Sequence, residues 1–206
     1  MQVAMFEFAL IGSNLIFAAT IVTSLLGMNR SPQIIDRCLF RPYYFLRRKQ
    51  YNTIVTSGFV HADLGHLVFN MVTFFFFAFP LEDFIETPSF LALYFFGLIA
   101  SHSCTYFKHK DHPEYASLGA SGAISAVLFA YIVYFPTDEL IILPIPIPIP
   151  APLFAIAYVG YSYWASLHSR DRINHDAHLC GALSGLVFVG VVDPWAFAEI
   201  LAILGG

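Results

Sequence analysis

The stretch GASGAISAVLFAYIVYF, residues 119–135, contains no Asp, Glu, Lys or Arg, and its serine is flanked by glycines at 119 and 122. A helix that crosses the hydrocarbon core of a bilayer needs about 20 predominantly apolar residues, so this stretch approaches the length of a membrane span. The whole chain shares this character. Of its 206 residues 58% are apolar and 12% are charged, against roughly 25% charged residues in soluble domains. The composition therefore predicts a membrane protein.

Six runs without acidic or basic residues predict six membrane-spanning helices. Their bounds are 8–26, 65–81, 89–107, 119–135, 152–167 and 177–192. Backbone groups in lipid must find hydrogen-bond partners within the protein, so such segments fold as helices that pack together. We therefore expect an all-α polytopic fold, a six-helix bundle that forms one transmembrane domain over residues 1–206. No cleavable leader is expected, and the apolar tail 194–204 is expected to end in the interface or against the bundle.

Two connections have unusual compositions. The first, 27–64, is long, and its residues 37–48 alternate bulky apolar side chains with arginine, which is typical of a segment anchored in the membrane interface. Alternatively, this segment forms a rim that admits or orients a substrate. Between the fourth and fifth runs, proline stands at every second position of 144–150. This pattern excludes a helix and favours a stiff connector in the polyproline II form.

The three cysteines give no sign of a covalent framework. Cys38, Cys104 and Cys180 are odd in number and widely spaced, and none belongs to a CxxC pair. We therefore predict that they are small core residues, not members of a disulfide framework or a metal site.

The basic residues are distributed unevenly. All ten Lys and Arg residues fall in the first, third and fifth connections. The positive-inside rule places such connections on the cytoplasmic side of the membrane and the N-terminus outside. The fourth and sixth runs begin at this same end of the bundle.

A candidate nucleophile opens the fourth run. Gly119 and Gly122 flank Ser121 and remove side-chain bulk, so another helix and a substrate backbone can approach closely. The free N–H groups and the dipole of a helix N-terminus favour negative charge, as an oxyanion requires. Taken alone, the same pattern also fits a small-residue packing motif with an incidental serine.

A candidate base opens the sixth run. His178 shares one helix face with Gly181, Ala182 and Gly185, which follow at offsets of three, four and seven. Close packing of this face on the start of the fourth run would bring the imidazole within hydrogen-bond reach of Ser121. Asp176 projects from a different face of the helix, so we do not assign it as the acid of a catalytic triad.

Polar side chains also mark the second run. His66 and Asn70 are four residues apart and share one face, so their donors can point into the bundle together. Asp63 precedes the run as a candidate helix cap, and His61 is expected near the mouth of the site. His66 could instead be a hydrogen-bonded histidine of the core. Because the chain also offers Asn70 and a serine nucleophile, we favour an oxyanion-binding role for His66.

Together these motifs resemble one known family, the rhomboid intramembrane serine proteases, in their six-span bacterial form. The resemblance covers nearly the whole chain and rests on His61-x4-His66-x3-Asn70, Gly119-x-Ser121-Gly122, Ala177-His178-x2-Gly181-x3-Gly185, and Glu82 soon after the second run.

The resemblance implies a mechanism and a setting. Ser121 would attack a peptide carbonyl while His178 takes its proton, as a dyad without an acid, and no cofactor is implied. Asn70, His66 and the Ser121 N–H would stabilise the oxyanion, and Glu82 would tie the far end of the bundle. The substrates would be single-span membrane proteins cleaved in or near their helices, and water would reach the serine through a polar cavity. The partners would be these substrates and the lipid bilayer, with no nucleic acid, in a bacterial inner membrane.

The chain departs from the family pattern at two places. A Trp-Arg pair that rhomboids often carry before the second-run motif is replaced by Asn52 and Thr53. Some members place a tyrosine four residues after the nucleophile, against the histidine, where this chain has Ser125. Support for His178 is then expected from fifth-run aromatics, namely Tyr161, Tyr163 or Trp164. Well-known bacterial members also open their site away from the cytoplasm, contrary to the charge distribution here.

Three other classes of protein fit the sequence less well. A rhomboid-like chaperone that binds client helices without cutting them typically lacks the serine or the histidine, and both are present here. The eight histidines suggest a metal transporter, but no acidic residue lies inside a run to pair with a cation. An intramembrane metalloprotease would need H-E-x-x-H on a helix, which the sequence lacks.

Overall fold

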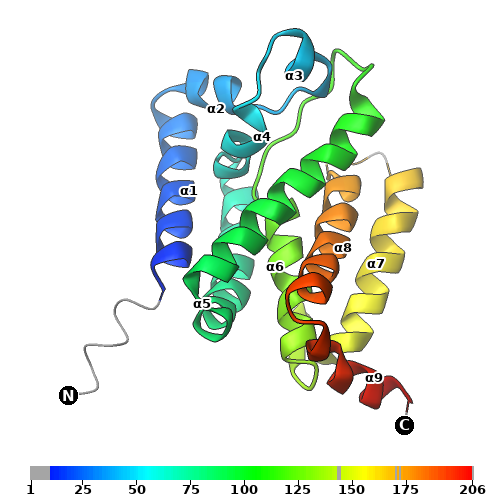
Figure 1. Cartoon of the computed structure of the whole chain (residues 1–206). Helices are drawn as coiled ribbons and strands as arrows, with labels where there is room; N and C mark the ends of the chain where they lie inside the picture. Colours follow the sequence, from blue (N-terminus) through cyan, green and yellow to red (C-terminus); the bar gives the residue numbers. More distant parts are fainter. Residues whose placement is uncertain (1–9, 143–144, 170, 172, 206) are drawn as a thin grey trace, which may run out of the picture.

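The structure, a computed structural model, describes residues 10–142, 145–169, 171 and 173–205. It is a helical bundle with one small hairpin (Figure 1). The elements are α1 (Ile11–Asn29), α2 (Pro32–Cys38), α3 (Pro42–Arg47), α4 (Thr53–Thr56), η2 (Ser57–Phe59), α5 (Leu64–His109), α6 (Ser121–Tyr134), β1 (Glu139–Ile142), β2 (Ile145–Pro150), α7 (Ala151–His168), α8 (His175–Val192), η3 (Pro194–Ala196) and α9 (Phe197–Gly205). The predicted all-α class is confirmed.

A helix lies in each of the six predicted runs, and α5 contains two of them, while residues 8 and 9 of the first run lie outside the described residues. Helix α5 spans 46 residues but turns sharply at Glu86, whose φ is 65° and ψ 155°, so it is two helices in sequence. Pro80 and Pro88 lie on either side of this turn, and each removes a backbone donor from the helical ladder. By length and composition α1, α5 and α8 can each cross a membrane, whereas α6 is apolar but shorter.

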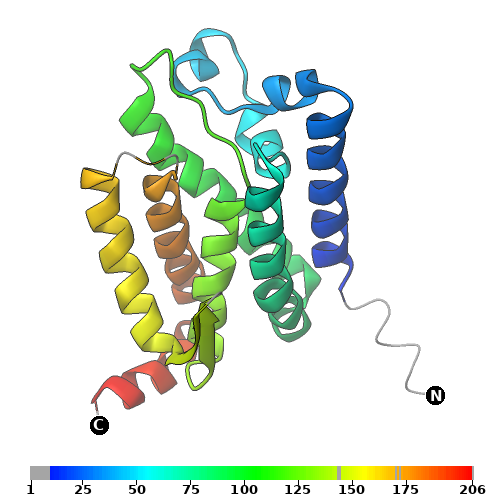
Figure 2. The same cartoon turned by 180° about the vertical axis from the view of Figure 1, so that it is seen from behind.

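The bundle is built around α6. Eleven of its 14 residues are buried, which is typical of a helix that is apolar all round. At 1.5 Å per residue α6 is about 21 Å long, shorter than the roughly 30 Å hydrocarbon core of a bilayer. Figure 2 shows the loop between α5 and α6 running down into the bundle before α6 begins. The first residue of α6 is therefore recessed from the end of the bundle.

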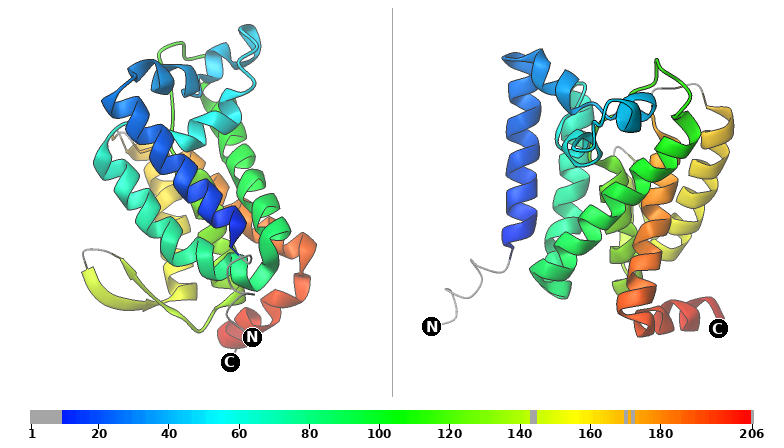
Figure 3. Two further views of the ribbon diagram at one scale, coloured as in Figure 1. Left: turned by 90° about the vertical axis from the view of Figure 1, so that its left-hand side faces the viewer. Right: turned by 45° about the horizontal axis from the view of Figure 1, so that its top comes forward.

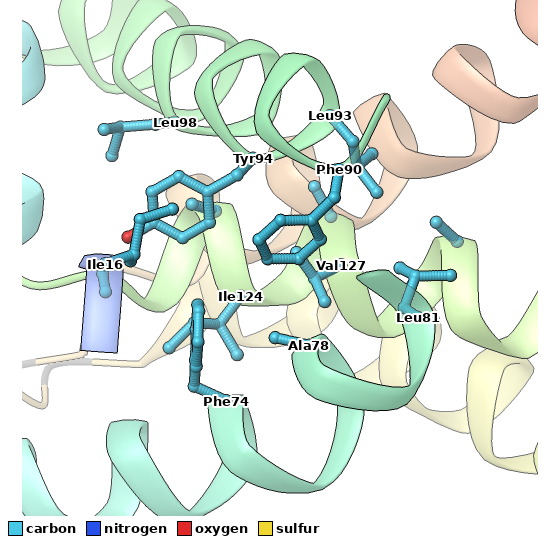
Figure 4. Packing of buried hydrophobic residues seen from close by; sticks show 14 of the residues in the cluster. Ile16, Phe74, Ala78, Leu81, Phe90, Leu93, Tyr94, Leu98, Ile124 and Val127 are labelled. Carbon is cyan, nitrogen blue, oxygen red and sulfur yellow. The ribbon is translucent and has the colours of Figure 1, made fainter. Parts of the chain in front are cut away.

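Aromatic rings fill the space between α5 and α6. Phe74 in the first half of α5 packs edge-on against Tyr94 in the second half, with ring centroids 5.9 Å apart. Figure 4 shows these rings beside Ile124 and Val127 of α6, and all four residues are buried. The contact closes the two halves of α5 around the central helix.

The long first connection packs over one end of the bundle. Phe40 forms an antiparallel bridge with Ser117, and its buried ring lies edge-on to His102 of α5 at 4.6 Å between centroids. The guanidinium of Arg47 lies 4.0 Å from the ring centroid of Tyr43. In place of a Trp-Arg pair, therefore, the bridge and these ring contacts hold the connection.

Residues 139–142 and 145–150 correct the expected polyproline II connector. As predicted they form no helix, but β1 and β2 pair as an antiparallel hairpin, with Leu140 opposite Ile149 and Ile141 opposite Pro148. The hairpin projects from the side of the bundle in Figure 3. Prolines at every second position leave the intervening isoleucine N–H groups to face β1, so proline is tolerated on this edge strand. Pro144 lies outside the described residues.

The apolar tail ends against the bundle, as expected. The short η3 leads into α9, which runs across the end of the bundle away from α2 and α3 (Figure 1). Phe197 and Ile200 are partly buried and pack against the main core, whereas Trp195 is 84% exposed.

A disulfide joins Cys104 of α5 to Cys180 of α8, which corrects the prediction of unpaired core cysteines. The two Cα atoms are 6.4 Å apart although 76 residues separate the cysteines in the sequence. Only the packing of α5 on α8 brings them together, so their spacing in the sequence gave no signal. Cys38 is free.

A buried carboxylate ties α1 to α5 at the opposite end. Glu82 is fully buried, and its two oxygens accept the backbone N–H groups of Gly12 at 2.8 Å and Ser13 at 2.6 Å. Thr87 donates its hydroxyl to the same carboxylate at 2.5 Å. These bonds satisfy N–H groups of the first turn of α1, which have no partner within the helix.

Replacing Glu82 with alanine is expected to lower the free energy of unfolding by about 3 kcal/mol, because two buried N–H groups lose their acceptor. Asp83→Ala, at the exposed neighbouring carboxylate, is the matched control and is expected to change it by less than about 0.5 kcal/mol. Unfolding of the detergent-solubilised protein measures both. Equal shifts in the two variants would contradict the role of Glu82.

Candidate active site

The helices α6 and α8 touch at backbone level. A Cβ at Gly181 would overlap the carbonyl oxygen of Gly122, and one at Gly185 would overlap that of Ala126. No residue larger than glycine fits at these two positions without moving a helix. The glycine stripe predicted beside His178 therefore does face the start of the fourth run.

Ser121 is the first residue of α6 and is partly exposed. The chain reaches it through Gly119, whose φ of +108° favours glycine. The Gly119 N–H donates to the Ser57 carbonyl at 2.9 Å. A Cβ at Gly119 would lie 2.8 Å from Cε1 of His66, so that imidazole packs directly on the glycine. A buried loop thus holds the serine at the N-terminus of α6.

His178 lies in the first turn of α8, which Asn174 caps by accepting the Ala177 N–H at 3.1 Å. Among the described residues no hydrogen bond joins His178 to Ser121. Their neighbours do approach each other, since a Cβ at Gly122 would lie 3.5 Å from the Ala177 carbonyl oxygen. Catalytic hydrogen bonds are often long without substrate and tighten in the complex. The structure therefore brings the two residues to one place without the bond that the sequence predicted.

The second-run residues lie beside this place. Asp63 caps α5 by accepting the His66 N–H at 2.8 Å, as predicted. Asn70 is buried one turn further on, and its amide donates to the His66 carbonyl at 2.9 Å. An amide nitrogen carries two hydrogens, so one donor remains for another acceptor.

His61 is buried, which corrects its expected place at the mouth of the site. Its Nδ1 lies 3.0 Å from the hydroxyl of Ser24 in α1, and its Nε2 lies 3.5 Å from the Ala120 N–H. Burial, and then the neighbouring His66, lower the pKa of His61 to about 3, against a raising effect of Asp63. The ring is therefore neutral at physiological pH, which suits an Nε2 that accepts the Ala120 N–H.

A small pocket of about 10 Å³, roughly the room that one water molecule needs, is lined in part by Ser121. Its lining residues are Ser101, His102, Ser117, Leu118, Gly119, Ser121, Gly122, Asn174 and Ala177. The hydroxyl of Ser117 is buried there without a hydrogen-bond partner among the described residues. Sequence reasoning missed Ser101 and His102, although they face the core with Thr105 at helical spacing. A pocket of this size does not form the polar water path that the resemblance implied.

The fifth-run aromatics do not surround His178 as expected. Tyr161, Tyr163 and Trp164 are each more than half exposed, and no ring contact of theirs with His178 occurs among the described residues. Tyr161 instead lies edge-on to the ring of His175 in α8, with 5.7 Å between centroids, and Trp164 stacks on His168 of its own helix. Ser125 is instead hydrogen-bonded to the hydroxyl of Tyr158 at 2.8 Å.

These features define a class of protein, a bundle of membrane-spanning helices with a serine and a histidine in the first turns of two touching helices. The family model described as Rhomboid domain matches residues 48–194. The chain therefore belongs to the rhomboid family, as its motifs indicated.

Three similar proteins carry the family name. Presenilin-associated rhomboid-like protein A, mitochondrial, of Danio rerio is 33% identical over 140 residues, which are 66% of this chain and 36% of that protein. RHOMBOID-like protein 12, mitochondrial, of Arabidopsis thaliana is 31% identical over 147 residues, 64% of this chain and 43% of that protein. Rhomboid protein 1, mitochondrial, of Saccharomyces cerevisiae is 27% identical over 183 residues, 82% of this chain and 52% of that protein. The chain thus spans about half, or less, of these relatives.

The membrane-spanning helices make this an integral membrane protein. All three relatives are named as mitochondrial proteins, which does not fit the expected bacterial inner membrane.

Gly181→Ala is expected to lower the free energy of unfolding by about 1–3 kcal/mol, because the new methyl group overlaps the Gly122 carbonyl. Gly160→Ala in α7 is the matched control. Nothing lies within 4 Å of a Cβ there, so this variant is expected to be neutral or up to about 1 kcal/mol more stable. Thermal unfolding in detergent compares the two, and a Gly181 variant as stable as the Gly160 variant would contradict the close contact.

Proposed function

We propose that the protein is an intramembrane serine endopeptidase that hydrolyses peptide bonds in or near the membrane helices of single-span proteins. The observation that carries the proposal is the backbone contact between Gly122 and Gly181. It places the N-termini of α6 and α8 together, and these carry Ser121 and His178. The proposed domain is the whole helical bundle, working within the bilayer.

In the proposed reaction, the Ser121 hydroxyl oxygen attacks the carbonyl carbon of the scissile bond and passes its proton to His178. The tetrahedral intermediate then collapses, and His178 gives that proton to the departing amine. Water attacks the resulting ester with His178 again acting as base, which releases the acid and restores Ser121. The partial exposure of Ser121 supports this proposal because the reaction needs the serine to be reached by substrate and water. These steps need no cofactor.

The oxyanion of the tetrahedral intermediate requires hydrogen-bond donors that stabilise its negative charge. The free N–H of Ser121 lies at the N-terminus of α6, where the helix dipole favours an anion. Asn70 keeps one amide hydrogen unused by the His66 carbonyl, and the His66 ring packs on Gly119 two residues before the serine. We assign these three groups to the oxyanion.

Ser121→Ala is expected to abolish both cleavage of tagged single-span substrates and labelling by a serine-directed fluorophosphonate, because both need the hydroxyl. Ser103→Ala is the matched control, since that membrane-embedded hydroxyl only donates to the Ile99 carbonyl of its own helix, at 2.8 Å. It is expected to keep both signals. Should the folded wild-type protein bind substrate helices yet show neither signal, the non-catalytic chaperone interpretation would replace the protease.

Asn70→Ala is expected to lower kcat by about 10²–10³ with residual activity, because one oxyanion donor is lost. Thr73→Val serves as the control, since its hydroxyl bonds the Phe69 carbonyl one turn back at 2.9 Å, and it is expected to stay near wild type. Steady-state cleavage kinetics on both variants measure this. An unchanged kcat for the Asn70 variant would remove it from the proposed oxyanion site.

A further inference from the structure

The ring of His178 has one aromatic neighbour among the described residues. The His175 ring centroid lies 6.2 Å from that of His178, with an angle of 83° between the planes. This is edge-to-face geometry, in which one ring restricts the tilt of the other. His175 belongs to the same helical turn, so backbone geometry fixes the spacing of the two rings.

Contacts on its other sides hold His175 in place. The residue is only 5% exposed, and its Nε2 lies 3.1 Å from Oδ2 of Asp171, in the loop before α8. On another side Tyr161 of α7 lies edge-on to the ring, with 5.7 Å between centroids. A buried side chain with a bonded nitrogen and two edge contacts has little rotational freedom left.

The loop in turn fixes Asp171. Its carboxylate accepts the Ser169 hydroxyl at 2.6 Å and the Ile173 N–H at 2.8 Å. The Ser169 bond first, then those from Ile173 and His175, lower the pKa of Asp171 to about 2. The carboxylate is therefore charged at physiological pH and faces the His175 side of the site.

We infer that His175, held by Asp171, is a positioning residue that fixes the His178 imidazole for proton transfer with Ser121. The inference rests on the proposed function. In this arrangement the carboxylate orients one imidazole, and that imidazole orients the next. It supplies the support for His178 that the exposed fifth-run aromatics do not. Geometry of this kind matters because a misplacement of about 1 Å costs about a hundredfold in rate.

The test compares kcat and KM for three variants, with active sites counted by fluorophosphonate labelling. His175→Ala is expected to lower kcat per labelled site by about tenfold to a hundredfold, with KM little changed. His175→Phe keeps a ring against His178 and is expected to recover part of the loss. His168→Ala, at an exposed histidine at the end of α7, is the matched control and is expected to match wild type.

The readouts separate this inference from the proposed function. A wild-type protein that neither labels nor cleaves would defeat the proposed function itself. An active wild type whose His175→Ala variant has fewer labelled sites but the same kcat per site would show a purely structural residue and overturn the inference. A His175→Phe variant no better than His175→Ala would also overturn it, because the ring contact would then contribute nothing.

Discussion

The structure depends on the close approach of α6 and α8. Their backbones meet where Gly181 faces the Gly122 carbonyl and Gly185 faces that of Ala126. Lipid offers no hydrophobic force to press helices together, so such contacts owe their strength to van der Waals packing of small residues. Because the contact begins one residue after Ser121, packing and site geometry are set by the same atoms. The other helices add a frame around this pair.

The two ends of the bundle are secured by different chemistry. At the end with α9, the buried carboxylate of Glu82 binds the first turn of α1 through short hydrogen bonds. At the end with Ser121, the contacts are more varied, and many of them are exposed. Lys108 of α5 bonds both the Ser166 carbonyl and the carboxylate of Asp176, and so joins three helices. Exposed ion pairs contribute little stability each.

Local sequence features predicted the helices and the motif residues, because charge-free runs and residue offsets depend on the chain alone. The sequence also predicted the Asp63 cap and the absence of helix over residues 145–150. It could not predict the disulfide, the pairing of β1 with β2, or the burial of His61 against Ser24. Each of these depends on which distant segments meet after the bundle has packed. The pair formed by Ser57 and His102, 2.8 Å apart, was missed for the same reason.

The bridge between Cys104 and Cys180 also bears on how the molecule is oriented. It joins α5 to α8 two residues after His178, so it lies at the Ser121 end. A structural disulfide persists where thiols are oxidised and is rare in a reducing cytosol. An intact bridge therefore favours an orientation with the Ser121 end on the oxidising side of its membrane. The basic residues at that end favour the opposite orientation, and their ion pairs with Asp36, Asp111 and Asp176 do not remove this preference, because the positive-inside rule counts Lys and Arg alone. The disulfide and the basic residues thus pull the same end of the bundle toward opposite sides of the membrane.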